Sequence, residues 1–382
     1  MPPQSTDIRV IYALIFFALL FLPISSAQTE TPVRIPATQA QAAQRNDEGA
    51  EAELSEGIRL TGQGRFRDAI PHLLAAQGRV SNGFAADFNL ALCHVAIGQD
   101  QAAIRILDSV LSTGHATASV YNLLAQAQIG ASQPEEAFKT FQQAVALDPK
   151  NEKLYLFLAD SCMDHKSYEL GLKFIDLGLR HLPDSARLHY QRGILLSFLD
   201  QPDNARQDLK LASKLAPGTA ISFLAQAQEG LLNGDMSQAI RAAREGGRKE
   251  PGNYILLTIL GQALIRQGAC PGQPEFSEAQ TALEKAVAER PEYSISQLAL
   301  GQLELMAGHL DQAIEHLMKA RQLAPDNPSV YSQLAAAYRQ RGDLQEAERM
   351  LAVLAGLNRQ QAAQYQLDPP DHKGSYIGSR KP

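Results

Sequence analysis

Four side chains of types that can ligate metal ions lie close together in the sequence: Asp160, Cys162, Asp164 and His165. If this segment is a helix, Cys162 and His165 are three residues apart on one face and can point toward the same ion. A zinc site needs at least three protein ligands, however, and Cys162 also falls at a core position of a helical pattern. We therefore predict that Cys162 is a buried core residue and that the chain holds no metal and no other cofactor.

The sequence lacks the motifs of common catalytic centres. It contains no glycine-rich phosphate loop followed by Lys and Ser or Thr, no H-E-x-x-H and no G-x-S-x-G. The formal net charge is −6, with 35 basic and 41 acidic residues. Nucleic-acid binding favours a basic surface. We predict that the protein is not an enzyme and that nucleic acid is not its partner; an enzyme would need a catalytic set assembled between distant segments.

Prolines recur along the chain at a nearly constant spacing. Pro149, Pro183, Pro217 and Pro251 are each 34 residues apart, and two more follow after 40 and 34 residues. We count units of 34 residues from residue 50, with six extra residues in unit 7, so that these prolines all occupy position 32. Positions 8 and 20 then hold Gly or Ala in all nine units, and position 24 is a larger apolar residue in eight. This period indicates a repeat architecture.

The repeated pattern predicts two antiparallel helices in each unit. Positions 4, 7, 8 and 11 share one helical face, and positions 20, 24 and 27 share another. Small side chains let the two helices approach closely, while larger ones interdigitate around them. Glycine at position 15 of six units ends the first helix, and proline at position 32 ends the second. Since one hairpin cannot bury its apolar face alone, the units must stack.

These columns of small residues and the position-32 proline resemble the tetratricopeptide repeat. The resemblance covers residues 50–361, and position 4, where the family often has Trp, is tyrosine in three units: Tyr121, Tyr155 and Tyr331. Units 1, 2 and 9 depart from the pattern by lacking the proline. The resemblance implies an all-α fold, a right-handed superhelical solenoid of nine helix-turn-helix units.

The N-terminus carries the pattern of an export signal. Arg9 precedes an apolar run from Val10 to Leu22, and Ser25 and Ala27 are the small residues of a cleavage site. We predict that residues 1–27 are a cleaved signal peptide and that the protein is extracytoplasmic, either periplasmic or secreted. The alternative is an uncleaved membrane anchor, although a bilayer span needs about 20 apolar residues.

Two further segments flank the array. Residues 28–49 are rich in Gln, Ala and Thr without apolar periodicity, which predicts a flexible linker. A polar helix over residues 358–367 is predicted to cap the array, so that residues 362–382 hold the end of this cap and a disordered tail. The six extra residues of unit 7 predict a surface loop, which either contacts a partner or is a tolerated insertion.

The three cysteines do not suggest a disulfide framework. Cys93 and Cys162 lie in units 2 and 4, so a whole unit separates them and we predict no bridge between them. Cys270 falls in the unit 7 loop, as a free thiol or a pairing site between molecules.

In the family that this chain resembles, the first helices line a concave groove that commonly holds an extended peptide or a partner helix. The groove positions are expected at 2, 5, 9 and 12, and here they carry amides, aromatics and charges that suit peptide recognition. The predicted partner-binding residues are Phe88, Asn122, Gln126, Lys153, Asp160, Arg187, Tyr190 and Gln228. Gln262 and Gln302 continue the row at position 9.

The resemblance and the predicted export signal together predict a non-catalytic extracytoplasmic scaffold that binds protein or peptide partners in its groove. The alternative is a structural accessory subunit of an envelope secretion or polysaccharide-export assembly. Cytosolic co-chaperones of this family clamp a C-terminal carboxylate with polar groups, where this chain has Phe88 and Leu92, so we predict no such clamp. A membrane is expected as a partner only if the signal segment is not cleaved.

Overall fold

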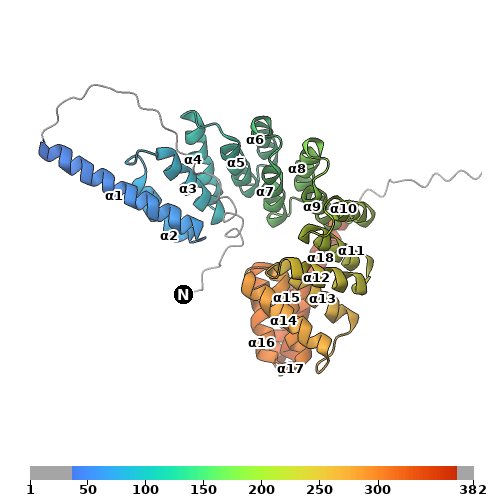
Figure 1. Ribbon diagram of the computed structural model, residues 1–382. Helices are drawn as coiled ribbons and strands as arrows, with labels where there is room; N and C mark the ends of the chain where they lie inside the picture. Colours follow the sequence, from blue (N-terminus) through green and yellow to red (C-terminus); the bar gives the residue numbers. More distant parts are fainter. Residues whose placement is uncertain (1–36, 368–382) are drawn as a thin grey trace, which may run out of the picture. The chain divides into compact units, whose positions relative to one another are not determined.

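The computed structural model describes residues 37–367, and this range contains eighteen α-helices and no strand (Figure 1). The predicted signal peptide and most of the predicted tail lie outside the described residues. The chain divides into two compact bodies, residues up to Leu195 and residues from Leu196. We call them the N-terminal body and the C-terminal body and describe each by itself. The all-α class and the nine predicted helix pairs are confirmed.

The N-terminal body is a series of helical hairpins. Its helices are α1 (Ala37–Gly62), α2 (Phe66–Ala76), α3 (Gly83–Ala96), α4 (Asp100–Ser112), α5 (Ala118–Gly130), α6 (Pro134–Leu147), α7 (Glu152–Asp164), α8 (Tyr168–His181) and most of α9 (Ala186–Phe198). Helices α1 with α2, α3 with α4, α5 with α6 and α7 with α8 pack as pairs. Aromatic rings fill the core of units 3 and 4, where Phe141 meets Tyr155 and Phe174 edge-on at 5.4 and 5.0 Å.

The C-terminal body repeats the same arrangement. Its helices are α10 (Pro202–Leu215), α11 (Ala220–Asn233), α12 (Met236–Lys249), α13 (Tyr254–Gln267), α14 (Pro274–Glu289), α15 (Ser294–Ala307), α16 (Leu310–Leu323), α17 (Pro328–Arg341) and α18 (Leu344–Leu367). Helices α11 with α12, α13 with α14, α15 with α16 and α17 with α18 form the hairpins.

The predicted register places the helix starts correctly. In units 3 to 9 the first helix begins at position 1, at Ala118, Glu152, Ala186, Ala220, Tyr254, Ser294 and Pro328. Each second helix that is followed by the position-32 proline ends two residues before it. A proline excludes the helical conformation from the residue that precedes it, and Asp148, before Pro149, has φ −147° and ψ 71°.

The first helix ends in a left-handed residue at position 15 of every unit. The predicted glycines all have positive φ: Gly64, Gly98, Gly234, Gly268, Gly308 and Gly342. The three units without glycine adopt the same conformation with Ser132, Lys166 and Asp200, at φ of 59°, 56° and 54°. A side chain with a Cβ costs about 1–2 kcal/mol in this region. Glycine at position 15 therefore relieves strain but is not required for the turn.

The small residues at positions 8 and 20 are buried in all nine units, as predicted. A Cβ atom added to Gly261, at position 8 of unit 7, would lie 2.4 Å from Cγ of Leu283 at position 24. Gly301 and Leu317 repeat this pair in unit 8 at 2.7 Å. The large residue at position 24 thus fills the space that the small residue at position 8 leaves.

Three segments differ from the expected boundaries. Helix α1 begins at Ala37, so residues 37–49, predicted as linker, are helical, because Ala and Gln are strong helix formers. The predicted cap is not a separate helix, since α18 continues unbroken to Leu367. In unit 7 the inserted residues both lengthen the turn and extend α14 to 16 residues. Among the described residues, none of the helices has the length and apolar character of a membrane span.

Candidate partner-binding face

We define the first-helix face as the residues at positions 2, 5, 9 and 12 of each unit, which share one side of the first helix. Within the N-terminal body α1 contacts α3, α3 contacts α5 and α5 contacts α7. Within the C-terminal body α11 contacts α13, α13 contacts α15 and α15 contacts α17. Each body therefore carries a face that continues from one first helix to the next.

Asn122 was predicted to bind a partner, but the structure buries it completely. Its Nδ2 donates to the carbonyl oxygen of Leu154 at 2.9 Å, and its Oδ1 accepts from Gln126 Nε2 at 2.7 Å. Asn122 therefore joins unit 3 to unit 4. The prediction that Asn122 lies at the surface is wrong. Its side chain points at the first helix of the next unit, where a buried amide must find hydrogen-bond partners inside the protein.

Phe88 needs the same correction. Its side chain is 5% exposed and packs against the ring of Phe84, with ring centroids 5.7 Å apart. It also occupies position 5, and its apolar ring gains more from burial between units 2 and 3 than from exposure. Neither Phe88 nor Asn122 presents a surface to a partner in this structure.

Position 9 is partly accessible in every unit except unit 2, where Leu92 is buried. Gln126 and Asp160 are half-buried in the N-terminal body, and Gln228 is half-buried in the C-terminal body. Asp160 Oδ1 accepts from Nε2 of Gln191 in the next unit, at 2.9 Å. No feature of the sequence indicates this bond, because Gln191 lies at position 6, outside the predicted face.

The charged and aromatic residues that were predicted to bind a partner lie in the first two turns of α7 and α9. Lys153 and Tyr190 are half-buried, and Arg187 is 63% exposed at its side chain. Arg187 Nη1 lies 3.7 Å from Oε2 of Glu152, which pairs unit 5 with unit 4. Such an exposed pair contributes little to stability. The guanidinium therefore remains accessible to a partner, and partner binding by these residues stays a prediction.

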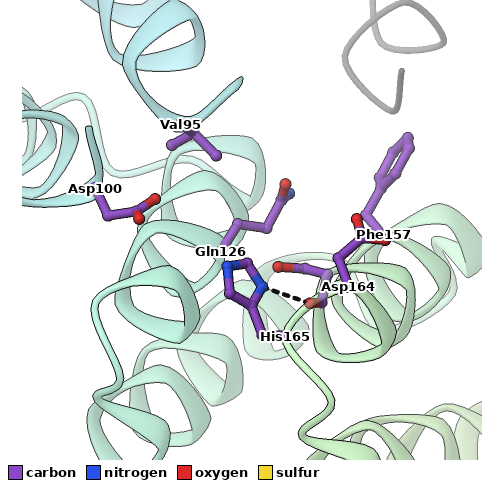
Figure 2. A pocket seen from close by; sticks show the side chains of 7 residues that line it. Val95, Asp100, Gln126, Phe157, Asp164 and His165 are labelled. Carbon is purple, nitrogen blue, oxygen red and sulfur yellow. Dashed lines mark hydrogen bonds between the residues drawn. The ribbon is translucent and has the colours of Figure 1, made fainter. Parts of the chain in front are cut away.

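A small hollow opens between units 2, 3 and 4 on this face (Figure 2). Figure 2 shows Gln126 and His165 at its centre, with Asp100 on one side and Phe157 on the other. Its volume of about 40 Å³ admits water but not a small-molecule substrate, whose sites hold roughly 300–1,000 Å³. The hollow is therefore a shallow feature of the first-helix face.

Asp100 lines this hollow and was missed at the sequence level. It is 7% exposed and begins α4 at position 17. The other eight units carry Phe, Tyr, Leu, Met or Pro at this position, so an acid there is a visible departure. The sequence signal that could have found Asp100 is that it differs from the residues at position 17 of the other units, more than that it is an acid.

The four residues examined as possible metal ligands, Asp160, Cys162, Asp164 and His165, do not form a metal site in the described part of the chain. Cys162 is fully buried in the core of units 3 and 4, and burial raises the pKa of its thiol. His165 Nδ1 donates to the carbonyl oxygen of Ser161 at 2.8 Å. Within residues 37–367 no group of three or more His, Cys, Asp or Glu side chains is placed to hold a metal. Cys93 and Cys162 are both free thiols, as predicted.

One set of regular bonds was not foreseen. The side chain at position 4 donates to the carbonyl oxygen of the preceding position-32 proline: Tyr155 to Pro149 at 2.8 Å, His189 to Pro183 at 2.9 Å, Gln297 to Pro291 at 2.8 Å and Tyr331 to Pro325 at 2.5 Å. Four units thus tie the first helix to the preceding turn with three different donor types. Position 4 requires only a side chain long enough to bring a hydrogen-bond donor to the proline carbonyl oxygen. Because Tyr, His and Gln all meet this requirement, no single residue type marks the bond in the sequence.

Comparison with protein families agrees with this repeat. Three family models described as tetratricopeptide repeat match residues 128–193 and 304–367, residues 54–117 and 272–328, and residues 186–219. They leave out residues 118–127 and 220–271, where the structure nevertheless continues the same helices. A comparison with curated proteins finds no match.

Solved structures share the fold at low sequence identity. A chain of the APC/C hetero-tetramer Cut9-Hcn1 aligns with a TM-score of 0.51 and 13% identity, covering 84% of this chain and 67% of that one. TTC0263, a thermophilic TPR protein in Thermus thermophilus, gives 0.41 and 22%, covering 48% and 100%. YrrB, described as a TPR protein with an unusual peptide-binding site, gives 0.31 and 16%, covering 50% and 96%.

Proposed function

We propose, from the premise that the chain belongs to the tetratricopeptide repeat family, that it is a non-catalytic scaffold that binds protein or peptide partners outside the cytoplasm. The observation that carries the proposal is the accessible column at position 9. Gln126 and Asp160 in the N-terminal body, and Gln228, Gln262 and Gln302 in the C-terminal body, are polar and half-buried. Half-buried amides and acids on adjacent helices suit hydrogen bonds to a peptide laid across them.

The small size of the hollow on this face of the N-terminal body supports the non-catalytic part. The repeat uses nearly all of residues 50–361 for packing, and the sequence lacks the common catalytic motifs. The extracytoplasmic part rests on the apolar run from Val10 to Leu22 and the small residues before position 28. Mass spectrometry of the N-terminus of the natural protein tests this part, and a terminus at Gln28 is the expected result.

Site-directed photo-crosslinking of the full chain in its native cells tests the binding face. The crosslinker replaces Lys153, Asp160 or Gln262 on the first-helix face, and Lys173 or Arg241 on the exposed sides of second helices as controls. We expect adducts with the same partner from the face positions and none from the controls. A variant with Lys153→Ala, Arg187→Ala and Tyr190→Ala should lose partners that bind the N-terminal body while keeping its helical content.

Adducts from the second-helix positions alone would contradict binding on the first-helix face. They would favour the alternative of a structural subunit in an envelope secretion or polysaccharide-export assembly. Measurable turnover of a substrate by the purified chain would contradict the non-catalytic part.

A further inference from the structure

The first helices of units 6, 7 and 8 repeat one pattern on their face. Position 2 is isoleucine, position 9 is glutamine and position 12 is leucine or isoleucine in all three. The residues are Ile221, Gln228 and Leu231 in α11, Ile255, Gln262 and Ile265 in α13, and Ile295, Gln302 and Leu305 in α15. Because α11 contacts α13 and α13 contacts α15, three matching rows lie side by side within the C-terminal body.

This part of the face carries no charge. Position 5 holds Leu224, Thr258 and Leu298, and none of the twelve side chains is Asp, Glu, Lys, Arg or His. Leu224 and Thr258 at position 5 and Ile265 and Leu305 at position 12 are buried, so the exposed part of this face consists mainly of the isoleucines at position 2 and the glutamines at position 9. A charged ligand segment would give up water here without gaining an ionic partner, which is costly. The electrostatic complement of this surface is an uncharged segment whose only strong polar groups are those of its backbone.

The three glutamines offer hydrogen bonds to such a backbone. Gln228, Gln262 and Gln302 are half-buried, and within residues 37–367 no hydrogen bond engages their amides. Each amide has two donors and one acceptor. The row therefore presents one unused amide per first helix, on the same side as the isoleucine at position 2 and two turns along the helix from it.

The spacing of the rows selects the conformation of the ligand. Packed helices lie about 8–10 Å apart, so amide and isoleucine recur at about that interval. A polyproline II helix has three residues per turn and rises about 3.1 Å per residue, so equivalent groups recur about every 9.3 Å. A β-strand repeats one face about every 6.6 Å and falls out of step with the rows.

We infer that this face of α11, α13 and α15 binds an uncharged polyproline II segment of a partner protein, one turn per repeat unit. The backbone of such a segment makes no internal hydrogen bonds, so its carbonyl oxygens are free to accept from the glutamines. An apolar side chain at every third residue packs between neighbouring isoleucines. The inference rests on the proposed function, since it specifies the ligand class for the C-terminal part of the same face.

Binding of synthetic peptides to the full chain, measured by calorimetry, tests the inference. The probe is four repeats of Pro-Pro-Leu with blocked ends. Six repeats of Pro-Leu keep the length but change the period to two residues, and four repeats of Pro-Pro-Glu keep the period but add charge. The face variant carries Gln228→Ala, Gln262→Ala and Gln302→Ala. The matched control removes three exposed glutamines from second helices, by Gln207→Ala, Gln312→Ala and Gln322→Ala.

We expect the Pro-Pro-Leu probe to bind the native chain and the control variant equally, and the face variant at least about tenfold more weakly. One lost hydrogen bond corresponds to roughly a two- to tenfold loss, so single variants give smaller steps should the triple variant misfold. Equal binding to the face variant, or equally tight binding of the Pro-Leu or Pro-Pro-Glu peptides, would overturn the inference. In that case crosslinks from Gln262 to a partner would still support the proposed function, whereas their absence as well would remove both.

Discussion

Units 3 to 5 and units 6 to 8 build the same helical hairpin with different turn residues. The turn at position 15 is left-handed in all six, but units 3 to 5 use Ser132, Lys166 and Asp200 where units 6 to 8 use glycine. In units 3, 4, 5, 7 and 8 the N–H of position 16 donates to the carbonyl oxygen of position 11, as from Ser167 to Cys162 at 2.8 Å, whereas the turn of unit 6 closes from Gly234 to Leu231 at 3.3 Å. The left-handed turn therefore forms with or without glycine, and units 3 to 5 accept the backbone strain.

The two groups also differ in the polar groups on their first-helix face. Units 3 to 5 use polar side chains between neighbouring units, through Asn122 and through Gln191 with Asp160. Units 6 and 7 are linked away from that face, by Arg244 and Glu278 at 2.6 Å, and the face of units 6 to 8 is left uncharged. The first-helix face thus presents side chains already held by hydrogen bonds on units 3 and 4 and unused amides on units 6 to 8.

Gly230→Ala in unit 6 should give the largest loss of stability. A Cβ there would lie 2.6 Å from the backbone nitrogen of Ala239, and backbone cannot move aside as a side chain can. We expect a loss of about 3 kcal/mol in urea unfolding followed by circular dichroism. Gly247→Ala is the matched control, because a Cβ there meets nothing within 4 Å, and it should stabilise α12 by about 0.5–1 kcal/mol. Equal effects would show that the glycines of this region are not packing contacts.

Asn122→Ala tests the hydrogen bonds of Asn122 that connect units 3 and 4. It removes two hydrogen bonds and leaves the carbonyl oxygen of Leu154 without this donor in a buried site, which costs about 2 kcal/mol. Gln126→Ala removes only one of the two bonds from a half-buried residue and should cost less than half as much. Hydrogen exchange should increase in α5 and α7 for Asn122→Ala. Unchanged exchange there would mean that packing alone joins these units.

Lys166→Gly should stabilise the protein by about 1 kcal/mol, since glycine enters the left-handed region without the cost of a Cβ. The mirror change, Gly268→Ala in unit 7, should destabilise by a similar amount, although the added Cβ would meet no atom within 4 Å. Both effects are read from urea midpoints. A neutral result for both would contradict the view that units 3 to 5 carry turn strain that units 6 to 8 avoid.

Tyr155→Phe should cost about 0.5–1 kcal/mol, because it removes the hydrogen bond to Pro149 while keeping the ring in the core. Burial raises the pKa of Tyr155 to about 12 from its ordinary value near 10. The neutral phenol is therefore favoured in the folded state, and its contribution is complete below pH 10 and falls as the pH rises toward 12. Unfolding at pH 9 and at pH 11.5 should show a smaller alkaline loss for Tyr155→Phe than for the native chain.

Most of the fold was predictable from the sequence, whereas the binding face was predictable only in part. The period of 34 and its small residues placed the helix starts correctly in seven units, because side-chain size at fixed positions directly limits how closely helices pack. Gln126, Asp160 and Gln228 at position 9 are half-buried, whereas Phe88 and Asn122 at position 5 are buried. A face assigned from helical period alone cannot show how far the next unit covers it, since that depends on the packing between units.

The sequence by itself determined the repeat, its register and the glycines and prolines that end helices in six units each, because these depend on interactions within one unit. Only the tertiary structure decided that Asn122 joins two units, that Tyr155 and His189 serve one bonding role, and that Lys166 adopts a left-handed turn. Each of these depends on a neighbouring unit or on the closure of the chain around the turn. Residue type sets what a side chain is able to do, and the surrounding backbone decides which of those possibilities is used.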